Sequence, residues 1–192
     1  MYLRVLVLLA CVIFVLSGCA GGPAVSPVVL PDSYGPLEHD EEIISKIDEL
    51  FRDKAPLGKM GRFTIPQLRT IARGTRSAPV AVYKCDVAVL KAFIASDWTP
   101  IVLLGPPVGR KNLHAVVGYD DATKEFLLTD PESDGHRKIG YDRLFRMLVG
   151  PEKACLLMFS QYTGTATVRR ALKNYIPEKR ADKIPIRTPR DR

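Results

Sequence analysis

The sequence has few of the residues that cross-link small folds or bind metals. Its 192 residues include four cysteines and three histidines. It has no Cys-x-x-Cys pair and no cluster of histidine and cysteine at the spacing of a metal site. Cys11 and Cys19 belong to an N-terminal apolar region, which leaves Cys85 and Cys155 for the rest of the chain. We therefore expect no metal and no cofactor, whereas a Cys85–Cys155 disulfide is permitted in an oxidising compartment.

Excess charge is also lacking over most of the chain. Hydrophobic residues make up 46% and charged residues 26%, as in a globular protein. The net charge is +7, but residues 161–192 hold nine Lys/Arg against three acids and so carry +6 of it. The remainder is close to neutral, so no nucleic-acid-binding domain is predicted. We interpret 161–192 as a basic C-terminal tail, either solvated and partly disordered or in contact with an anionic surface such as lipid headgroups.

The N-terminus has the pattern of a secretory signal. Arg4 precedes an apolar run from Val5 to Leu16, and Ser17-Gly18-Cys19 follows with small residues before the cysteine. The run is shorter than the ~20 apolar residues of a transmembrane helix, although an uncleaved anchor or ordinary secretion stays open. The segment resembles the bacterial lipoprotein signal. That resemblance implies lipidation of Cys19, attachment to the cell envelope with the domain outside the cytoplasm, and, from Ala20, an outer-membrane destination where one exists.

The rest of the chain predicts helices first and strands later. After the signal peptide (1–18) come a tether (19–36), rich in Gly and Pro, one globular domain (37–160) and the basic tail (161–192). Within the domain the apolar spacing predicts helices at 40–53, from Thr64, after Asp86 and at 140–148. Strands are predicted at 79–83, 100–104, 113–119, 125–130 and 154–159. This order indicates an α+β fold with an antiparallel sheet.

One predicted hairpin brings two catalytic residue types together. If Tyr119 lies opposite Glu125 across the turn, His114 lies opposite Asp130 on the neighbouring strand. Directly opposed side chains have Cβ atoms about 5 Å apart, so Asp130 could orient the imidazole as in a nucleophile–His–Asp site. A slip of one residue would separate the pair, and His114 could then be an ordinary strand residue.

The remaining histidines and cysteines give weaker signals. His39 and His136 lie among charged and turn residues and are expected at the surface. Cys155 belongs to an apolar strand and is expected in the core. Cys85 precedes a helix that Asp86 can cap, so it is a candidate nucleophile as well as a candidate structural thiol.

Three segments resemble the bacteriocin-leader-processing cysteine peptidases and their papain-like relatives. They are Trp98-Thr99-Pro100-Ile101-Val102-Leu103-Leu104, Leu113-His114-Ala115-Val116-Val117-Gly118-Tyr119-Asp120 and Leu128-Thr129-Asp130-Pro131. The acidic helix and the Thr-Ile-Pro-Gln-Leu segment before them are also similar to that family. The resemblance spans roughly residues 33–159. It implies a papain-like fold in which helices pack on an antiparallel sheet, His114 is a general base and Asp130 orients it.

The family's nucleophile motif is not present. Its Cys-Gly-Pro reads Tyr34-Gly35-Pro36 here, no apolar helix follows, and no glutamine occurs before Gln67. Tyrosine cannot replace a thiolate at neutral pH. Three functions stay open: a peptidase-like domain that binds peptides or a protein partner without cleaving them, an active cysteine peptidase, and a lipoprotein whose basic tail is its working element.

Overall fold

The computed structural model describes residues 28–37, 64–73, 77–105, 113–129, 135–150 and 152–191. The described helices are α3 (Ile65–Ala72), α4 (Val87–Ala95), α5 (Tyr141–Met147), α6 (Thr165–Tyr175) and α7 (Glu178–Ala181). The described strands are β1 (Ser33–Tyr34), β2 (Ala78–Val82), β3 (Ile101–Leu103), β4 (Leu113–Asp120), β5 (Glu125–Thr129), β6 (His136–Gly140), β7 (Cys155–Phe159) and β8 (Ile186–Arg187). The predicted signal peptide, Cys19, His39, Asp130 and the helix at 40–53 lie outside the described residues.

The strands form one antiparallel sheet of eight strands. Their order is β6-β5-β4-β3-β7-β2-β8, and β1 pairs with the far end of β4. The α+β class and the antiparallel sheet are therefore confirmed. The five predicted strands correspond to β2, β3, β4, β5 and β7, and the helix expected at 140–148 corresponds to α5.

Two helix starts follow the capping patterns read from the sequence. Thr64 accepts a hydrogen bond from the Gln67 amide (3.4 Å), and the Gln67 side chain accepts one from the Thr64 amide (2.9 Å), which completes a capping box at α3. At α4 the Asp86 carboxylate accepts a hydrogen bond from the Val89 amide (3.1 Å). Both predicted caps are confirmed.

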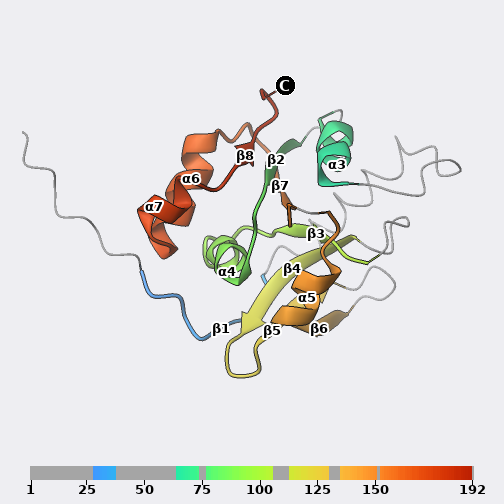
Figure 1. Ribbon diagram of the computed structural model, residues 1–192, viewed down its shortest axis with the longest axis vertical. Helices are drawn as coiled ribbons and strands as arrows, with labels where there is room; N and C mark the ends of the chain where they lie inside the picture. Colours follow the sequence, from blue (N-terminus) through green and yellow to red (C-terminus); the bar gives the residue numbers. More distant parts are fainter. Residues whose placement is uncertain are drawn as a thin grey trace, which may run out of the picture.

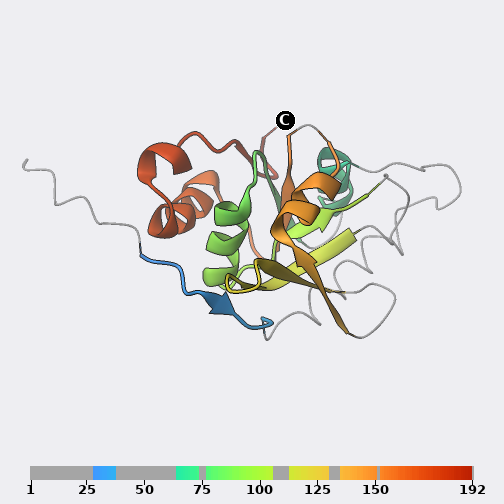
Figure 2. The same cartoon turned by 60° about the horizontal axis from the view of Figure 1, so that its bottom comes forward.

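Helices cover both faces of the sheet (Figures 1 and 2). On one face the core is built with α4, α5 and α6, and includes Phe93, Leu144 and Leu172. On the other face α3 packs Leu68 and its neighbours against the sheet. The sequence of β7 is continuously apolar because its residues alternate between these two cores, so that both faces of the strand are buried.

The β4–β5 hairpin begins in a different register from the predicted one. Asp120, not Tyr119, lies opposite Glu125. The Asp120 carboxylate accepts hydrogen bonds from the Ala122 amide (2.9 Å) and the Thr123 amide (3.4 Å), so the turn takes four residues rather than five. A bulge between Val116 and Gly118 then inserts one residue into β4 and places Val116 opposite Leu128. The pairing of Val116 with Leu128 is therefore the one that the predicted register requires.

Residues 28–37, which we call the N-terminal strap, are bound to the domain rather than acting as a free tether. Ser33 and Tyr34 pair with Asp120 and Tyr119 as strand β1. The Leu37 amide donates to Val117 O (3.0 Å), and the Leu37 side chain is buried. The predicted tether (19–36) is corrected to this extent, because its last residues extend the sheet.

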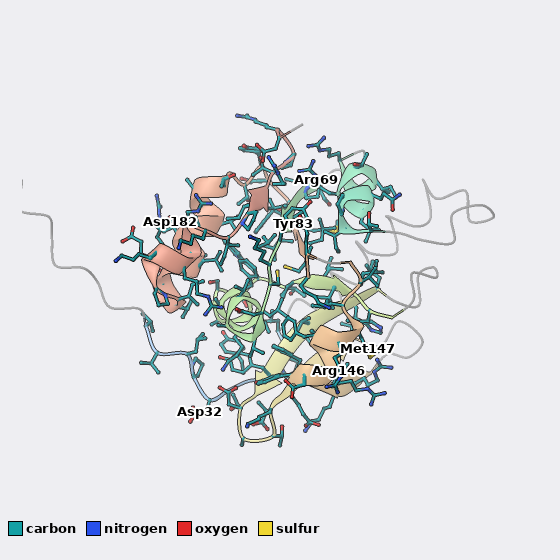
Figure 3. All side chains as sticks on the ribbon, viewed as in Figure 1. Asp32, Arg69, Tyr83, Arg146, Met147 and Asp182 are labelled. Atoms are coloured by element: carbon teal, nitrogen blue, oxygen red, sulfur yellow. The ribbon has the colours of Figure 1, made fainter. Side chains whose placement is uncertain are left out.

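Residues 161–191, which we call the C-terminal segment, are part of the folded domain. This corrects the predicted boundary at 160 and the predicted solvated tail. Helix α6 buries Val168 and Leu172, and β8 pairs with β2 and buries Ile186. The last described residues also contact α3, where the Arg69 side chain donates hydrogen bonds to Thr188 O (3.4 Å) and Asp191 O (3.2 Å) (Figure 3). The positive charges occupy the outer faces of elements whose inner faces are apolar.

Candidate functional site

His114 lies in the middle of the sheet and is almost completely buried. Its exposed fraction is 5%. The imidazole Nδ1 is 2.9 Å from the carbonyl oxygen of Thr129 on β5. A carbonyl oxygen can only accept, so Nδ1 carries a proton and donates to Thr129 O.

Thr129 holds the two strands together beside His114. Its hydroxyl oxygen accepts a hydrogen bond from the Ala115 amide (2.9 Å), and its side chain is 3% exposed. One residue thus fixes the imidazole with its carbonyl oxygen and the β4 backbone with its side chain. No pattern in the sequence singles out Thr129. Asp130, the predicted orienting residue, lies outside the described residues.

Cys85 does not lie next to His114. Cys155 and His114 both pair with Val102 of β3, one from each side, so the three residues form a row across one sheet face. With strands about 4.8 Å apart, the backbones of Cys155 and His114 are separated by roughly 10 Å, with Val102 between them. The Cys85 sulfur is at the Cys155 end of this row, 3.5 Å from the Cys155 sulfur. The structure therefore does not bring together the predicted base and the substitute nucleophile.

Both thiols are buried, and the pKa of the Cys155 thiol is raised as well. Cys85 is 5% exposed and Cys155 is fully buried. The Cys85 thiol also lies 3.3 Å from Val82 O, an acceptor for its proton. The hydrogen bond from Cys85, together with burial, raises the pKa of the Cys155 thiol well above its ordinary value. A reactive cysteine needs a lowered pKa and access to solvent, and this pair has neither feature at Cys155.

Tyr34-Gly35-Pro36 does not begin a helix beside His114. Tyr34 is in β1 and pairs with Tyr119, five positions along β4 from His114. At about 3.3 Å per strand residue, this is roughly 16 Å. The Tyr34 and Tyr119 rings stack with centroids 6.1 Å apart. The tyrosine in the nucleophile's sequence position thus packs against another strand residue.

Gly118 allows the strap to cross β4 at this point. A Cβ atom at Gly118 would lie 2.7 Å from Tyr34 O and 3.0 Å from Gly35 O, both of which are backbone atoms. Only a residue without a side chain permits so close an approach. Gly118 directly follows the residue that the bulge inserts into β4, so the bulge and the crossing of the strap are next to each other.

A small hollow opens between the strap and the β4–β5 hairpin. Its volume is about 230 Å³, and its lining includes Tyr34, Tyr119, Glu125, Leu127 and Lys138. Small-molecule sites usually measure about 300–1,000 Å³, so this hollow fits a side chain of a peptide better than a cofactor. It combines aromatic and aliphatic surface with two carboxylates, Asp120 and Glu125, and one lysine, Lys138.

A polar network behind the strap was not predicted from the sequence. The buried Lys91 of α4 is paired with Asp121, and the Tyr141 hydroxyl donates to the other oxygen of that carboxylate (2.7 Å). Lys91 also lies over the Tyr119 ring, 4.5 Å from its centroid, and the Tyr119 hydroxyl donates to Pro31 O (3.0 Å). The network thereby connects α4, the hairpin turn, α5 and the strap. Only the turn at Asp121 was visible as a pattern in the sequence.

The electrostatics of this network follow from its geometry. Partial burial opposes ionisation of Asp121, but hydrogen bonds from Lys91 and Tyr141 outweigh it and lower the pKa of that carboxyl. Burial, followed by the nearby Asp121 charge, raises the pKa of Tyr119 to about 12. Burial, followed by the hydrogen bond to Asp121, raises the pKa of Tyr141 well above the ordinary value of a tyrosine. Both tyrosines are therefore neutral hydrogen-bond donors at physiological pH.

Two other predicted features can be located. His136 is exposed on β6, as expected, although that strand was not predicted. Cys155 lies in the core, as expected. Within the described part of the chain, no group of three or more His, Cys, Asp or Glu residues could hold a metal ion. Among the same residues, no helix is both long enough and apolar enough to cross a membrane.

Comparisons with protein-family models, with curated proteins and with solved structures found no match for this chain.

Proposed function

We propose that this chain is a lipid-anchored protein of the bacterial cell envelope whose papain-like domain binds a peptide segment or a protein partner without cleaving it. The observation that carries the proposal is the separation of thiol from imidazole. Cys85 is buried against Cys155, with Val102 between that pair and His114. Cysteine peptidases need the thiol within hydrogen-bond reach of its base.

The hollow beside the strap is the proposed binding site. Its Leu127 and tyrosine surfaces suit an apolar or aromatic side chain, and Lys138 and Glu125 can bind polar groups of a peptide backbone or terminus. The hollow lies beside β1, so a bound segment in extended conformation would run next to strands that are already fixed. A site of this size recognises one or two side chains of its ligand.

The membrane attachment is proposed at Cys19. The first described residue, Val28, donates its amide to Asn174 O at the end of α6 (2.6 Å). Eight residues lie between Cys19 and Val28, and the nine residue steps from one to the other reach roughly 30 Å when extended. Arg170, Lys179 and Lys183 are exposed on this part of the molecule and form no ion pair with another described residue. We propose that they contact anionic headgroups.

Thiol reactivity tests the non-catalytic half of the proposal. The full-length protein is first reduced, so that any Cys85–Cys155 bond is open, and is then treated with iodoacetamide between pH 5 and 9. Labelling of Cys85 is followed by peptide mass spectrometry, with His114→Ala as the matched variant. We expect slow labelling that is unchanged in His114→Ala. Fast labelling near neutral pH that depends on His114 would instead support an active cysteine peptidase.

Peptide selection tests the binding half. A phage-displayed library of random peptides is selected on the full-length protein and on Leu127→Lys, which fills the hollow with a charged chain. Ala166→Lys, on the exposed face of α6, is the matched control. We expect enrichment of related peptides on the wild type and on the control, and their loss on Leu127→Lys. Enrichment that is equal on all three proteins would reject the hollow as the site.

Lipidation and surface contact have separate tests. Growth with an alkyne-tagged fatty acid should label the wild-type protein and leave Cys19→Ala unlabelled. Replacing Arg170, Lys179 and Lys183 by Gln should weaken flotation of unlipidated protein with vesicles that contain anionic lipid, because each basic residue near such a surface contributes about 1 kcal/mol of binding free energy at low salt. Salt at 0.5 M should also weaken flotation, because it screens these charges. Unchanged flotation would remove the headgroup contact from the proposal.

A further inference from the structure

Cys85 and Cys155 are brought together by the backbone and not only by their side chains. They are 70 positions apart in the sequence, and their sulfur atoms lie 3.5 Å apart. Cys85 lies in the connection from β2 to α4, directly before the cap residue Asp86, and Cys155 is the first residue of β7. Cys155 is the strand partner of Val82 at the end of β2.

Two backbone hydrogen bonds extend the pairing beyond the end of β2. The Lys84 amide donates to Glu152 O (2.7 Å), and the Cys85 amide donates to Lys153 O (2.8 Å). Lys84 has φ 55° and Lys153 has φ 45°, a left-handed conformation that lysine rarely adopts. The two segments are thus held against each other at defined points, which fixes the approach of the two sulfur atoms.

We propose that Cys85 and Cys155 form a disulfide bond in the exported protein. This inference takes from the proposed function the placement of the domain outside the cytoplasm, where disulfides form and persist. A disulfide has an S–S length of about 2.0 Å, so the sulfur atoms, now 3.5 Å apart, need to approach by about 1.5 Å.

The oxidation is a thiol–disulfide exchange with a disulfide-bonded oxidant, either a thiol oxidoreductase or a small disulfide. The thiolate of one cysteine attacks the oxidant's S–S bond, forms a mixed disulfide and releases one thiol of the oxidant. The thiolate of the second cysteine then attacks the protein sulfur of the mixed disulfide and releases the other thiol. Two protein thiols are oxidised and one disulfide is reduced to two thiols. Because both cysteines are buried in the finished fold, the exchange takes place while the chain is folding.

The bond would have two consequences. It would tie the connection that precedes α4 to the start of β7, so that these two segments could not separate. It would also remove the last thiol that could act with His114, which makes the domain non-catalytic for a covalent reason as well as a geometric one.

The thiol state in the full-length protein tests the proposal. The protein is extracted from the envelope in detergent, denatured and treated with iodoacetamide before or after reduction, and the peptides containing Cys85 and Cys155 are analysed by mass spectrometry. We expect a linked peptide pair before reduction and two alkylated peptides after it. Two alkylated peptides without prior reduction would overturn the proposal.

Parallel measurements separate this result from the proposed function. Lipidation at Cys19 and peptide selection report on the proposed function and do not depend on the Cys85–Cys155 bond. The reduced full-length protein is also refolded in a glutathione redox buffer, which supplies a small disulfide whatever the cellular location. Formation of the bond there supports the pairing even if the chain proves not to be exported, whereas two free thiols at excess oxidised glutathione overturn it.

Stability gives a second readout, with Cys85→Ala/Cys155→Ala as the matched variant that cannot form the bond. Protein that is denatured, reduced and refolded in reductant should have a Tm roughly 10 °C below that of the oxidised wild type, the shift expected from a structural disulfide in a domain of this size. The same treatment should leave the Tm of the double variant unchanged. Equal Tm values for the oxidised and the reduced, refolded wild type would contradict a structural disulfide.

Discussion

The N-terminal strap and the C-terminal segment lie at opposite ends of the chain and are attached to the same domain by different forces. Of residues 28–37, only Leu37 is buried, and the strap is held mainly by backbone hydrogen bonds to β4 and its turn. The C-terminal segment instead buries Val168, Ala171, Leu172, Ile176, Ala181, Ile184 and Ile186. A hydrogen bond contributes about 0.5–1.5 kcal/mol net, whereas a large buried side chain contributes about 1.5–3 kcal/mol. The C-terminal segment should therefore stabilise the domain, and the strap should be an addition to it.

The largest effect is expected from removing core volume under the C-terminal segment. Leu172 of α6 is fully buried in the core that α4 shares. Leu172→Ala should lower the free energy of unfolding by about 2–5 kcal/mol, measured by urea denaturation. Arg170→Ala, on the exposed side of the same helix, is the control and should change stability by about 0.5 kcal/mol or less. Equal losses in the two variants would mean that α6 does not belong to the core.

A smaller effect is expected where the strap crosses β4. Gly118→Ala would place a methyl group 2.7 Å from Tyr34 O, so the strap backbone must shift. We expect a loss of about 1–3 kcal/mol and faster hydrogen exchange of the Leu37 amide, whose bond to Val117 O depends on the crossing.

Gly35→Ala is the matched control, because a Cβ atom there would have no neighbour within 4 Å. It should leave the exchange rate of Leu37 unchanged. Slow exchange in Gly118→Ala would show that the strap does not need the close approach.

The same comparison explains what the sequence could and could not predict. Between residues 64 and 159, strand runs and caps such as Thr64 and Asp86 are local signals, and the structure follows them. In the C-terminal segment, Val168, Leu172 and Ile176 are spaced four residues apart, the spacing of a buried helix face. The many Lys and Arg residues around this pattern led to the prediction of a solvated tail. Charged residues lie on the exposed face of a helix or strand, and they do not exclude an apolar buried face.

The strap and the candidate site were harder to predict for a different reason. No periodicity marks Ser33 and Tyr34 as a strand, because their pairing depends on β4, more than 80 residues away in the sequence. The hairpin register also required two non-local facts, the Asp120 turn and the Val116–Gly118 bulge. His114 was found from its place opposite Asp130 in the predicted hairpin and from the resemblance of its segment to a peptidase family. Its distance from Cys85 depends on the order of β7, β3 and β4 in the sheet.

The polar network behind the strap should have a pH-dependent effect of intermediate size. The folded-state pKa of Asp121 is lowered, so the carboxylate contributes stability above its unfolded pKa of about 3.9. That contribution is lost as the pH falls through the lower folded-state value. Asp121→Asn leaves Lys91 without its partner and should cost about 1–2 kcal/mol at pH 7, a figure reduced because the Asp121 side chain is 34% exposed.

Urea denaturation at pH 7 and below pH 4 measures this difference. The gap between wild type and Asp121→Asn should narrow as the pH falls below 4. Asp142→Asn, an exposed carboxylate on α5, is the control and should show no such change. A gap that stays constant with pH would mean that packing, and not the charge of Asp121, stabilises the network.

The smallest effect is expected from the ion pair between Arg180 and Asp86, which connects the C-terminal segment to the cap of α4. Both side chains are about half exposed, at 44% and 50%, and exposed pairs contribute about 0.2–1 kcal/mol. Asp86 also caps α4, so its removal would mix two effects. Asp86→Asn keeps a cap acceptor and loses only the charge, which makes Asp86→Asn, Arg180→Gln and their combination a suitable double-mutant cycle. We expect a coupling energy below 1 kcal/mol that falls further in 0.5 M salt, because exposed charges are screened. A large coupling energy that does not change with salt would mean that polar contacts hold the C-terminal segment, as they hold the strap. The two ends of the chain would then not differ in the force that attaches them.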